Sequence, residues 1–381
     1  MKTTNNNSQN IFIDALDYSR GLNGKPLDMQ KALELMQKAA DDGHAGALFR
    51  LGVWHWGGIA VLKDLPKAEE YFEKAKAQGY PKKQAESGDM VAQSEMGACY
   101  AFGLVGESQD YQKANGWYLK AANKGCAFSQ NNLGASYYHG FGVDKDLKTA
   151  TEWYAKSAEK GFYNALHSLG VCYENGEGVP KNTKKALELY EKAANIGQSN
   201  SAFNLGNYYY KCDKIGNAEI DRLYGECEKW YARAAELGNA QAAYNLAYLY
   251  DEGLELKQDF DKMAHYYDLA VKLGHIEAQY KLGICYIRGE GVEKCHKTAA
   301  MWLTKSAEQG LADAQYTLAQ RYEQGQGVEA SQDEEEEREL QTQADRTGRP
   351  QKLIIELNKV KIFFPISWTD EQKQTYKENM L

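Results

Sequence analysis

Apolar and small residues recur along the chain with the spacing of a helix face. One stripe occupies positions i, i+4, i+5 and i+8: Ala165, Leu169, Gly170 and Tyr173. A second stripe follows after a short polar stretch: Ala186, Tyr190, Ala193 and Ala194. Each stripe predicts an amphipathic helix, and the short connection predicts that the two helices lie antiparallel. We call the first helix of such a pair helix A and the second helix B.

The same pair of stripes returns about every 36 residues. Each copy of helix A carries an anchor dipeptide, Leu or Met followed by Gly or Ala: Leu51-Gly52, Met96-Gly97, Leu133-Gly134, Leu169-Gly170, Leu205-Gly206, Leu246-Ala247, Leu282-Gly283 and Leu318-Ala319. The gaps between anchors are 45, 37, 36, 36, 41, 36 and 36 residues. Each helix B carries a motif such as "WYAKSAEKG" from Trp153. This period predicts a solenoid of stacked helix pairs.

A Gly-x-Gly-Val element follows helix A in four copies, beginning at Gly140, Gly176, Gly289 and Gly325. Taken alone, "CYENGEGVPKN" (residues 172–182) resembles a phosphate-binding loop. A nucleotide loop occurs once per domain, between a strand and a helix, whereas this element recurs between two helical patterns. We therefore interpret it as the turn between helix A and helix B.

The second anchor residue lies inside a predicted helix, where glycine costs roughly 1 kcal/mol relative to alanine. Six copies nevertheless have Gly there, and the other two have Ala. This predicts a close approach of helix A and helix B, with Tyr or Trp rings packed against the bare backbone. The glycine after each helix B, such as Gly197, is expected to be a left-handed C-terminal cap.

The repeat pattern covers residues 10–348, which predicts the extent of the solenoid. Residues 1–9 predict a disordered tail, and the acidic segment 330–348 predicts a degraded last helix B. Insertions fall at residues 80–88, where we expect a longer helix B or a bulge, and at residues 211–221, where we expect a longer loop.

Residues 349–381 depart from the repeat and predict a C-terminal capping helix or tail. A helix starting at Pro350 would align four apolar residues on one face: Leu353, Leu357, Val360 and Phe364. A strand through Val360, Ile362 and Phe364 is the alternative. Thr369 and Gln372 have the spacing of a capping box, which predicts a final short helix.

Net charge and hydropathy exclude several functions for this chain of 381 residues. Its net charge of −8 argues against a general nucleic-acid binder, which needs a basic surface, and against docking on an anionic membrane. No run of about 18 apolar residues predicts a membrane-spanning helix, and "MKTTNNNSQN" lacks the apolar core of a secretion signal. We therefore expect a cytoplasmic protein without membrane insertion.

Candidate catalytic and metal-ligating residues are few. The seven cysteines form no C-x-x-C pair, and Cys99, Cys172 and Cys285 share one repeat position, which predicts small buried core residues. Cys295-His296 stands alone in a predicted loop, and His167, at position −2, is expected to be a surface or packing residue rather than a catalyst. No H-E-x-x-H, P-loop or Ser-His-Asp pattern is present. The sequence predicts no catalytic site, no metal and no cofactor.

The repeat "LGxxYxxGxGVxxDxxxAxxWYxKAAxxG" resembles the Sel-1-like repeat (SLR) family, a relative of the tetratricopeptide repeat. One copy carries the whole pattern: Leu133, Gly134, Tyr137, Gly140, Gly142, Val143, Asp146, Ala150, Trp153, Tyr154, Lys156, Ala158 and Gly161. The resemblance implies an all-α, right-handed α/α superhelical solenoid of about nine helix pairs with a short non-repeat tail. It also implies a scaffold or adaptor. Some secreted members of the family are stapled by disulfides and carry a "KAC" element. This sequence has no such element, so it does not support that subtype.

The face of helix A opposite its core stripe is the candidate partner-binding surface, because it lines the concave groove in related tetratricopeptide arrays. It occupies positions −2, +2 and +5 from the anchor Leu or Met. The candidate residues are Trp56, Tyr138, Phe203, Asn207, Tyr210, Tyr244, Tyr248, Asp251, Tyr280, Ile287 and Tyr316. Two interpretations stay open: aromatic residues at −2 pack against the next helix A, or a tyrosine-rich groove anchors a partner. We expect Tyr210, Tyr248 and Ile287 to favour binding.

The leading functional hypothesis is a non-catalytic adaptor that binds a protein or peptide in this groove. Family resemblance alone implies a second hypothesis, a bacterial immunity protein that neutralises a cognate secreted toxin of the type VI kind. The net negative charge suits a basic toxin surface. A third hypothesis is a regulatory adaptor in a signalling or assembly complex. A toxin-like gene beside this one would favour the second hypothesis, and housekeeping neighbours would count against it.

Overall fold

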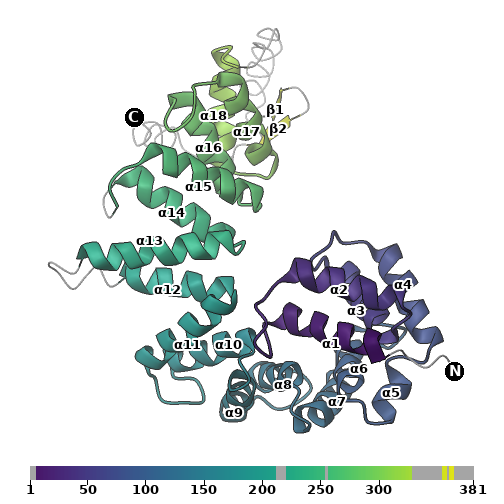
Figure 1. Cartoon of the computed structure of the whole chain (residues 1–381). Helices are drawn as coiled ribbons and strands as arrows, with labels where there is room; N and C mark the ends of the chain where they lie inside the picture. Colours follow the sequence, from purple (N-terminus) through teal and green to yellow (C-terminus); the bar gives the residue numbers. More distant parts are fainter. Residues whose placement is uncertain (1–5, 212–219, 254–255, 328–353, 358–359, 364–381) are drawn as a thin grey trace, which may run out of the picture. The chain divides into compact units, whose positions relative to one another are not determined.

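The computed structural model describes residues 6–211, 220–253, 256–327, 354–357 and 360–363. Helices follow one another as pairs joined by short loops (Figure 1). The chain divides into two compact units, Met1–Tyr208 and Tyr209–Leu381. The first unit contains α1 (Asn6–Arg20), α2 (Met29–Asp41), α3 (Ala45–Gly57), α4 (Leu65–Ala77), α5 (Lys82–Glu86), α6 (Met90–Phe102), α7 (Tyr111–Asn123), α8 (Ala127–His139), α9 (Leu147–Ala158), α10 (Tyr163–Asn175), α11 (Thr183–Ile196) and most of α12 (Ser199–Lys211).

The second unit begins with the last residues of α12. Its other elements are α13 (Ile220–Glu236), α14 (Ala240–Glu252), α15 (Phe260–Lys272), α16 (Ile276–Arg288), α17 (His296–Glu308), α18 (Ala312–Glu323), β1 (Ile354–Leu357) and β2 (Val360–Phe363). This order confirms an α/α solenoid of consecutive helix pairs. The predicted last helix B, residues 330–348, lies outside the described residues.

Helix ends follow from recurring residues. The residue before most helices B is Asp or Asn, and its side chain accepts a hydrogen bond from a first-turn N–H: Asp64, Asp110, Asp146, Asn182 and Asp259. Gly176 ends α10 with φ 79°, and Gly197 ends α11 with φ 129°. The glycine after helix B thus has the predicted positive φ, but Gly197 lies outside the left-handed αL region, to which Gly161, with φ 79°, is closer.

The glycine of the anchor dipeptide lies where helix A and helix B touch. A Cβ atom added at Gly170 would lie 2.6 Å from Cε1 of Tyr190, and one at Gly134 would lie 2.6 Å from the Tyr154 ring. Tyr190 is 1% exposed and Tyr154 is 4% exposed. The tyrosine ring thus occupies the volume of a side chain, which confirms the predicted close approach.

The second glycine of the Gly-x-Gly-Val loop contacts a neighbouring helix pair. Gly178 has φ 72°, and a Cβ there would overlap the carbonyl oxygen of Leu147 at the start of α9. Gly291 meets the carbonyl oxygen of Phe260 in the same way. The loop therefore packs on backbone, which confirms its interpretation as a solenoid turn.

The Trp and Lys of the helix B motif form cation–π pairs on the surface. The Lys156 ammonium lies 4.1 Å from the Trp153 ring centroid, and Lys120 lies 3.8 Å from that of Trp117. Positions i and i+3 share one helix face, so the lysine reaches over the ring. Lys185, in the first turn of α11, similarly lies 4.3 Å from the Tyr173 ring centroid in α10.

Two segments differ from the sequence predictions, and part of a third lies outside the described residues. Helix α1 begins at Asn6, inside the predicted tail of residues 1–9, because Phe12 and Leu16 are buried and stabilise the helix that its polar first turn extends. The insertion 80–88 forms the separate short helix α5 rather than an extension of α4, since Gly79 ends α4 with φ 79° and Pro81 lacks an N–H. In the second insertion, residues 212–219 lie outside the described residues.

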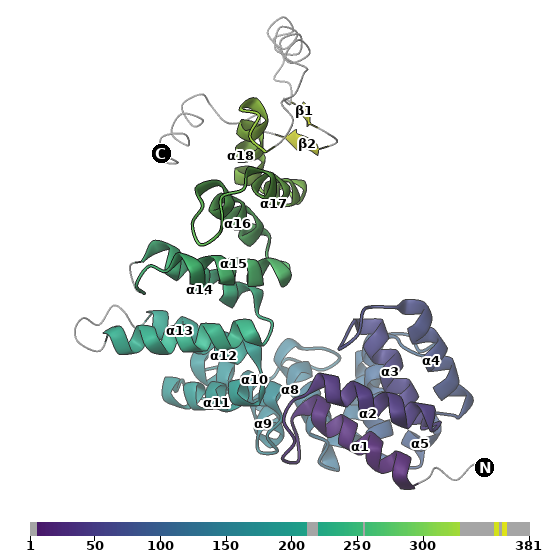
Figure 2. The same cartoon turned by 45° about the horizontal axis from the view of Figure 1, so that its top comes forward.

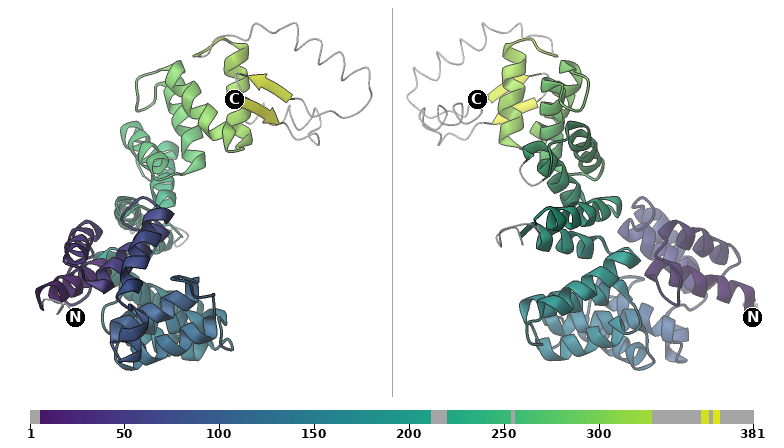
Figure 3. Two further views of the ribbon diagram at one scale, coloured as in Figure 1. Left: turned by 90° about the vertical axis from the view of Figure 1, so that its right-hand side faces the viewer. Right: turned by 60° about the vertical axis from the view of Figure 1, so that its left-hand side comes forward.

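The C-terminal segment forms a hairpin rather than the helix predicted from Pro350 to Phe364. Strands β1 and β2 are antiparallel, with Ile355 opposite Ile362, and β2 lies beside α17 (Figures 2 and 3). The strand alternative is the one formed, because β-branched residues favour extended backbone. The predicted final helix near Thr369 lies outside the described residues.

The first helix pair contacts helices α8 and α11, which are distant from it in the sequence but belong to the same unit. The Arg20 guanidinium lies 5.1 Å from the Phe128 ring centroid in α8, and Leu22 packs against the core formed by α8 to α11. A Cβ at Gly21 would lie 2.5 Å from Cγ2 of Ile196. The end of α1 and the loop after it therefore occupy space beside α8 and α11.

A buried ion pair lies near this contact. Arg50 in α3 donates to the Glu95 carboxylate in α6, and their side chains are 10% and 1% exposed. Burial, and then the charge of Arg50, lower the pKa of Arg20. Two guanidinium groups therefore share the neighbourhood of one buried carboxylate.

Acid is expected to destabilise the first unit through His44. Burial lowers the pKa of His44, whose neutral ring accepts from the Ala47 N–H at 3.2 Å and contacts Gln9 Oε1 at 2.7 Å. Because the folded pKa lies below the unfolded value of about 6.5, this stability is present above that pH and is lost as pH falls through the folded pKa.

We expect the Tm to fall by about 2–4 °C more in the parent protein than in His44→Asn between about pH 7 and pH 5. Asparagine keeps the cap acceptor, as Asn239 does before α14, and it does not titrate. Thermal unfolding followed by circular dichroism measures both. Equal acid shifts in the two proteins would exclude this role for His44.

Candidate functional site

Three sequence-predicted residues meet around one pocket in the second unit. The pocket has a volume of about 300 Å³, and its lining comes from the end of α12, from α13 and from α14. Figure 1 labels these three helices. Its lining is Tyr210, Tyr231, Tyr244, Asn245, Tyr248 and Leu249. We call it the tyrosine pocket. Tyr210 is 36% exposed and Tyr248 is 39% exposed, so two rings reach solvent at its edge.

The repeat register explains how these tyrosines converge. Tyr244 and Tyr248 are four residues apart on α14, which places them on one helix face. Tyr210 stands at position +5 of the preceding helix A. Tyr231 is the aromatic residue of the helix B motif "WYARAAELG" and is 2% exposed. Buried Tyr231 thus forms the floor, and the other tyrosines form the walls.

Two carboxylates and one ammonium group lie near the pocket. The pKa of Tyr244 is raised, chiefly by burial and then by the charges of Glu277, Tyr248 and Asp251. Asp251 Oδ2 lies 3.7 Å from the Lys281 ammonium, which in turn lies 5.8 Å from the Tyr248 ring centroid. One ring face at the pocket therefore already has a cationic neighbour from α16.

Tyr244 is held in place by stacking. Its ring lies 4.4 Å from that of His275 with an interplanar angle of 9°, and 5.8 Å from the Tyr267 ring. His275 in turn caps α16 by accepting from the Ala278 N–H. Tyr244 is consequently half-buried, as the packing interpretation of position −2 proposes, and it also lines the pocket.

The remaining candidates do not line this pocket. Trp56 is 37% exposed and lies 5.9 Å from the Phe102 ring, and half-buried Tyr138 donates to Glu177 at 2.6 Å. Tyr280 and Ile287 pack against the core around Leu318. The other half-buried candidates are Phe203, Asn207, Asp251 and Tyr316.

Sequence reasoning missed three lining residues, Tyr231, Asn245 and Leu249. Tyr231 belongs to the core motif of helix B, where every copy has an apolar residue, so its pattern indicates packing alone. Asn245 and Leu249 fall outside positions −2, +2 and +5. Only the meeting of three helices brings these residues to a common pocket.

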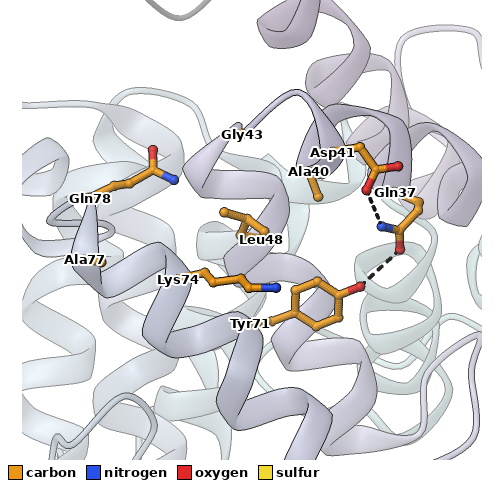
Figure 4. Close-up of a pocket in the computed structure, with 9 residues that line it drawn as sticks. All are labelled: Gln37, Ala40, Asp41, Gly43, Leu48, Tyr71, Lys74, Ala77 and Gln78. Atoms are coloured by element: carbon orange, nitrogen blue, oxygen red, sulfur yellow. Dashed lines mark hydrogen bonds between the residues drawn. The ribbon is translucent and has the colours of Figure 1, made fainter. Parts of the chain in front are cut away.

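A second hollow, of about 590 Å³, lies in the first unit between α2, α3 and α4 (Figure 4). Gln37 crosses one wall, since it donates to Asp41 at 2.8 Å and accepts from the Tyr71 hydroxyl at 3.2 Å. Lys74 forms an ion pair with Glu70. These polar groups already bind one another, and no sequence-predicted site residue lines the hollow.

Reactive side chains do not gather in the described part of the chain. No three His, Cys, Asp or Glu residues there lie close enough to hold a metal. The predicted core cysteines Cys99, Cys172 and Cys285 are buried, as expected. His167 is half-buried, and its Nδ1 lies 2.9 Å from the Ser201 hydroxyl. Among the described helices, none is long and apolar enough to cross a bilayer.

The Sel1 repeat family model matches almost the whole described solenoid. The matched segments are residues 16–44, 45–80, 91–126, 127–162, 164–198, 199–239, 240–275, 276–311 and 312–336. The chain belongs to the Sel1 repeat family. This scaffold supports a protein-interaction role. No curated protein matches the chain.

Solved structures similar to this chain include other Sel1 repeat proteins. A Sel1 repeat protein from Oxalobacter formigenes is 26% identical, with a TM-score of 0.56 over 77% of this chain and 81% of that one. A protective antigen of uropathogenic Escherichia coli with an SLR fold is 29% identical, with a TM-score of 0.43 over 85% and 74%. An immunity protein from Pseudomonas aeruginosa is 25% identical, with a TM-score of 0.31 over 51% and 70%.

Proposed function

We propose that this protein is a non-catalytic adaptor that binds a protein or peptide partner through the helix A surface of its second unit. The observation that carries this proposal is the tyrosine pocket, with Tyr210 and Tyr248 exposed at its edge. Tyrosine offers a large contact area and a polar end at little entropic cost, which is why it dominates many interfaces.

Charge distribution supports a basic partner. Residues 209–381 carry 30 Asp and Glu against 22 Lys and Arg, whereas residues 1–208 carry 23 of each. The whole net charge of −8 therefore belongs to the unit that holds the tyrosine pocket. Opposite charge on a partner raises its association rate and helps to exclude wrong partners.

Photo-crosslinking tests the surface directly. A benzophenone amino acid placed at Tyr248 or Tyr210, in the cells that produce the protein, is expected to capture the same partner. Placed at Met301, which is 45% exposed on the helix B α17, it is expected to capture none. Capture at Met301 alone would contradict the proposal.

Binding by purified variants gives the energetic test once the crosslinked partner is identified. Tyr248→Ala or Tyr210→Ala is expected to weaken the complex by roughly 2 kcal/mol without changing the Tm, because both rings are partly exposed. Tyr111→Ala, at a site that is 37% exposed in the first unit, is the matched control. Normal binding by both pocket variants would exclude this surface.

The immunity hypothesis is a narrower form of the same proposal, in which the partner is a cognate toxin. The acidic second unit supports the immunity hypothesis if the toxin presents a basic surface. A toxin-like neighbouring gene whose purified product binds this chain is the outcome expected. Binding that survives Tyr248→Ala would place a toxin elsewhere on the protein.

A further inference from the structure

The size of the tyrosine pocket limits what can enter it. A pocket of about 300 Å³ lies at the lower limit of the range for small-molecule sites, which is roughly 300–1,000 Å³. It therefore suits one long side chain of a partner rather than a helix or a folded domain. Its lining is four phenol rings, one amide and one leucine, with no charged residue.

The aromatic lining and the net negative charge of the second unit favour a cation. Aromatic faces carry partial negative charge and attract ammonium and guanidinium groups. Burial is the main cause of the raised pKa of Tyr244, and the charges of Glu277 and Asp251 act in the same direction. Asp251 is paired with Lys281 at 3.7 Å, so Glu277 and the net negative charge of the second unit carry the electrostatic argument. A carboxylate ligand would meet repulsion from Glu277, and an uncharged apolar ligand would gain nothing from this charge.

Contacts within the chain show the same chemistry repeatedly. Lys262 in α15 lies 4.8 Å from the ring centroid of Tyr250 in α14. Arg20, although distant in sequence, lies 5.1 Å from the Phe128 ring centroid. In that contact, the guanidinium of Arg20 comes from a distant segment of the sequence and lies over an aromatic ring of a helix A. It is the arrangement that a partner's arginine would reproduce in the second unit.

We propose that the tyrosine pocket receives an arginine side chain from a basic segment of the partner. This inference rests on the proposed function, because it names the chemistry that the same surface recognises. The planar guanidinium stacks on a ring face and retains in-plane N–H donors for the phenol oxygens at the edge. Lysine, a compact and strongly hydrated charge, fits such a stacked site less well.

A fluorine resonance can report occupation of the pocket in the full-length protein. 3-Fluorotyrosine is incorporated at position 248 alone, and the protein is titrated with a blocked Gly-Gly-Arg-Gly-Gly peptide. The neutral control peptide has citrulline in place of arginine, and a third peptide has lysine. We expect a saturable shift with arginine and about tenfold or more weaker binding with citrulline, since only the cationic attraction is removed.

Variants locate the binding. Tyr210→Ala and Tyr244→Ala are expected to weaken the arginine peptide, whereas Tyr111→Ala leaves it unchanged. Tyr244→Ala could weaken binding by disturbing the packing on His275. Tyr210→Ala, with an unchanged Tm, tests the pocket without that complication. Equal affinity for the citrulline peptide, or a response to arginine that never saturates, would overturn the proposal.

The outcomes also separate this inference from the proposed function. If crosslinking at Tyr248 captures a partner while the arginine peptide does not bind, the surface stands and the assignment of arginine is wrong. If the arginine peptide binds but no partner is captured at Tyr248 or Tyr210, the pocket chemistry stands and the adaptor proposal fails. A lysine peptide that binds as tightly as arginine would contradict the stacking argument.

Discussion

Gly170→Leu is expected to lower the free energy of unfolding by about 3 kcal/mol. Even a Cβ atom at this position would lie 2.6 Å from Cε1 and 2.8 Å from Cδ1 of Tyr190. The ring is 1% exposed and donates its hydroxyl to Glu174 at 2.6 Å, so it has no free space to rotate into. α10 and α11 must therefore separate, which removes contacts along the whole pair. Chemical denaturation measures the change.

Gly116→Leu is the matched control for this substitution. Gly116 also lies inside a helix of the first unit, but a Cβ there meets nothing within 4 Å. Removing a helical glycine without a clash is expected to stabilise the protein by up to about 1 kcal/mol. If Gly170→Leu is as stable as the parent protein, the two helices do not require a bare backbone at their contact.

Glu95→Ala is expected to lower the free energy of unfolding by about 3–5 kcal/mol. Its carboxylate accepts from Arg50, and both side chains are buried. Without Glu95, the guanidinium groups of Arg50 and Arg20 remain buried beside each other with no opposing carboxylate from α6. Their mutual repulsion already contributes to the lowered pKa of Arg20.

Two further variants separate this effect from a general loss of charge. Glu70→Ala removes an exposed pair with Lys74 and is expected to leave the free energy of unfolding almost unchanged, because solvent screens exposed pairs. Arg50→Met combined with Glu95→Leu removes both charges and is expected to recover most of the stability lost in Glu95→Ala. A Glu95→Ala protein as stable as Glu70→Ala would mean that the buried carboxylate is dispensable.

Local patterns in the sequence were sufficient for the repeat itself. The stripe through Leu169 and Tyr190, the positive φ of the glycine after helix B and the close approach at Gly170 were each predicted, because each depends on contacts within one helix pair. The repeat pattern did not predict the structure of segments that occur only once in the chain, because no second copy of them is available for comparison. The C-terminal segment reads as a helix or a strand, and Pro81 interrupts an insertion that is otherwise rich in helix-forming residues.

The candidate site was predictable only in part. Position in the repeat selected Tyr210, Tyr244 and Tyr248, which the structure brings to one pocket. It also selected Ile287, which instead packs against a core cluster, since position +5 is exposed in one pair and covered in another. Tyr231 carried only the signal of a core residue, because helix B uses the same aromatic position in other copies to fill the space beside glycine.

The sequence by itself determined that this protein is an array of helix pairs, where most of those helices begin and end, and which small residues hold the pairs together. Those features follow from periodicity and from short-range sterics, which any copy of the repeat expresses. Only the tertiary structure decided that Arg20 meets Phe128, that Arg50 meets Glu95, and that four tyrosines enclose one pocket. These contacts join residues of different helix pairs, and their distances depend on how successive pairs are rotated, which no single repeat encodes.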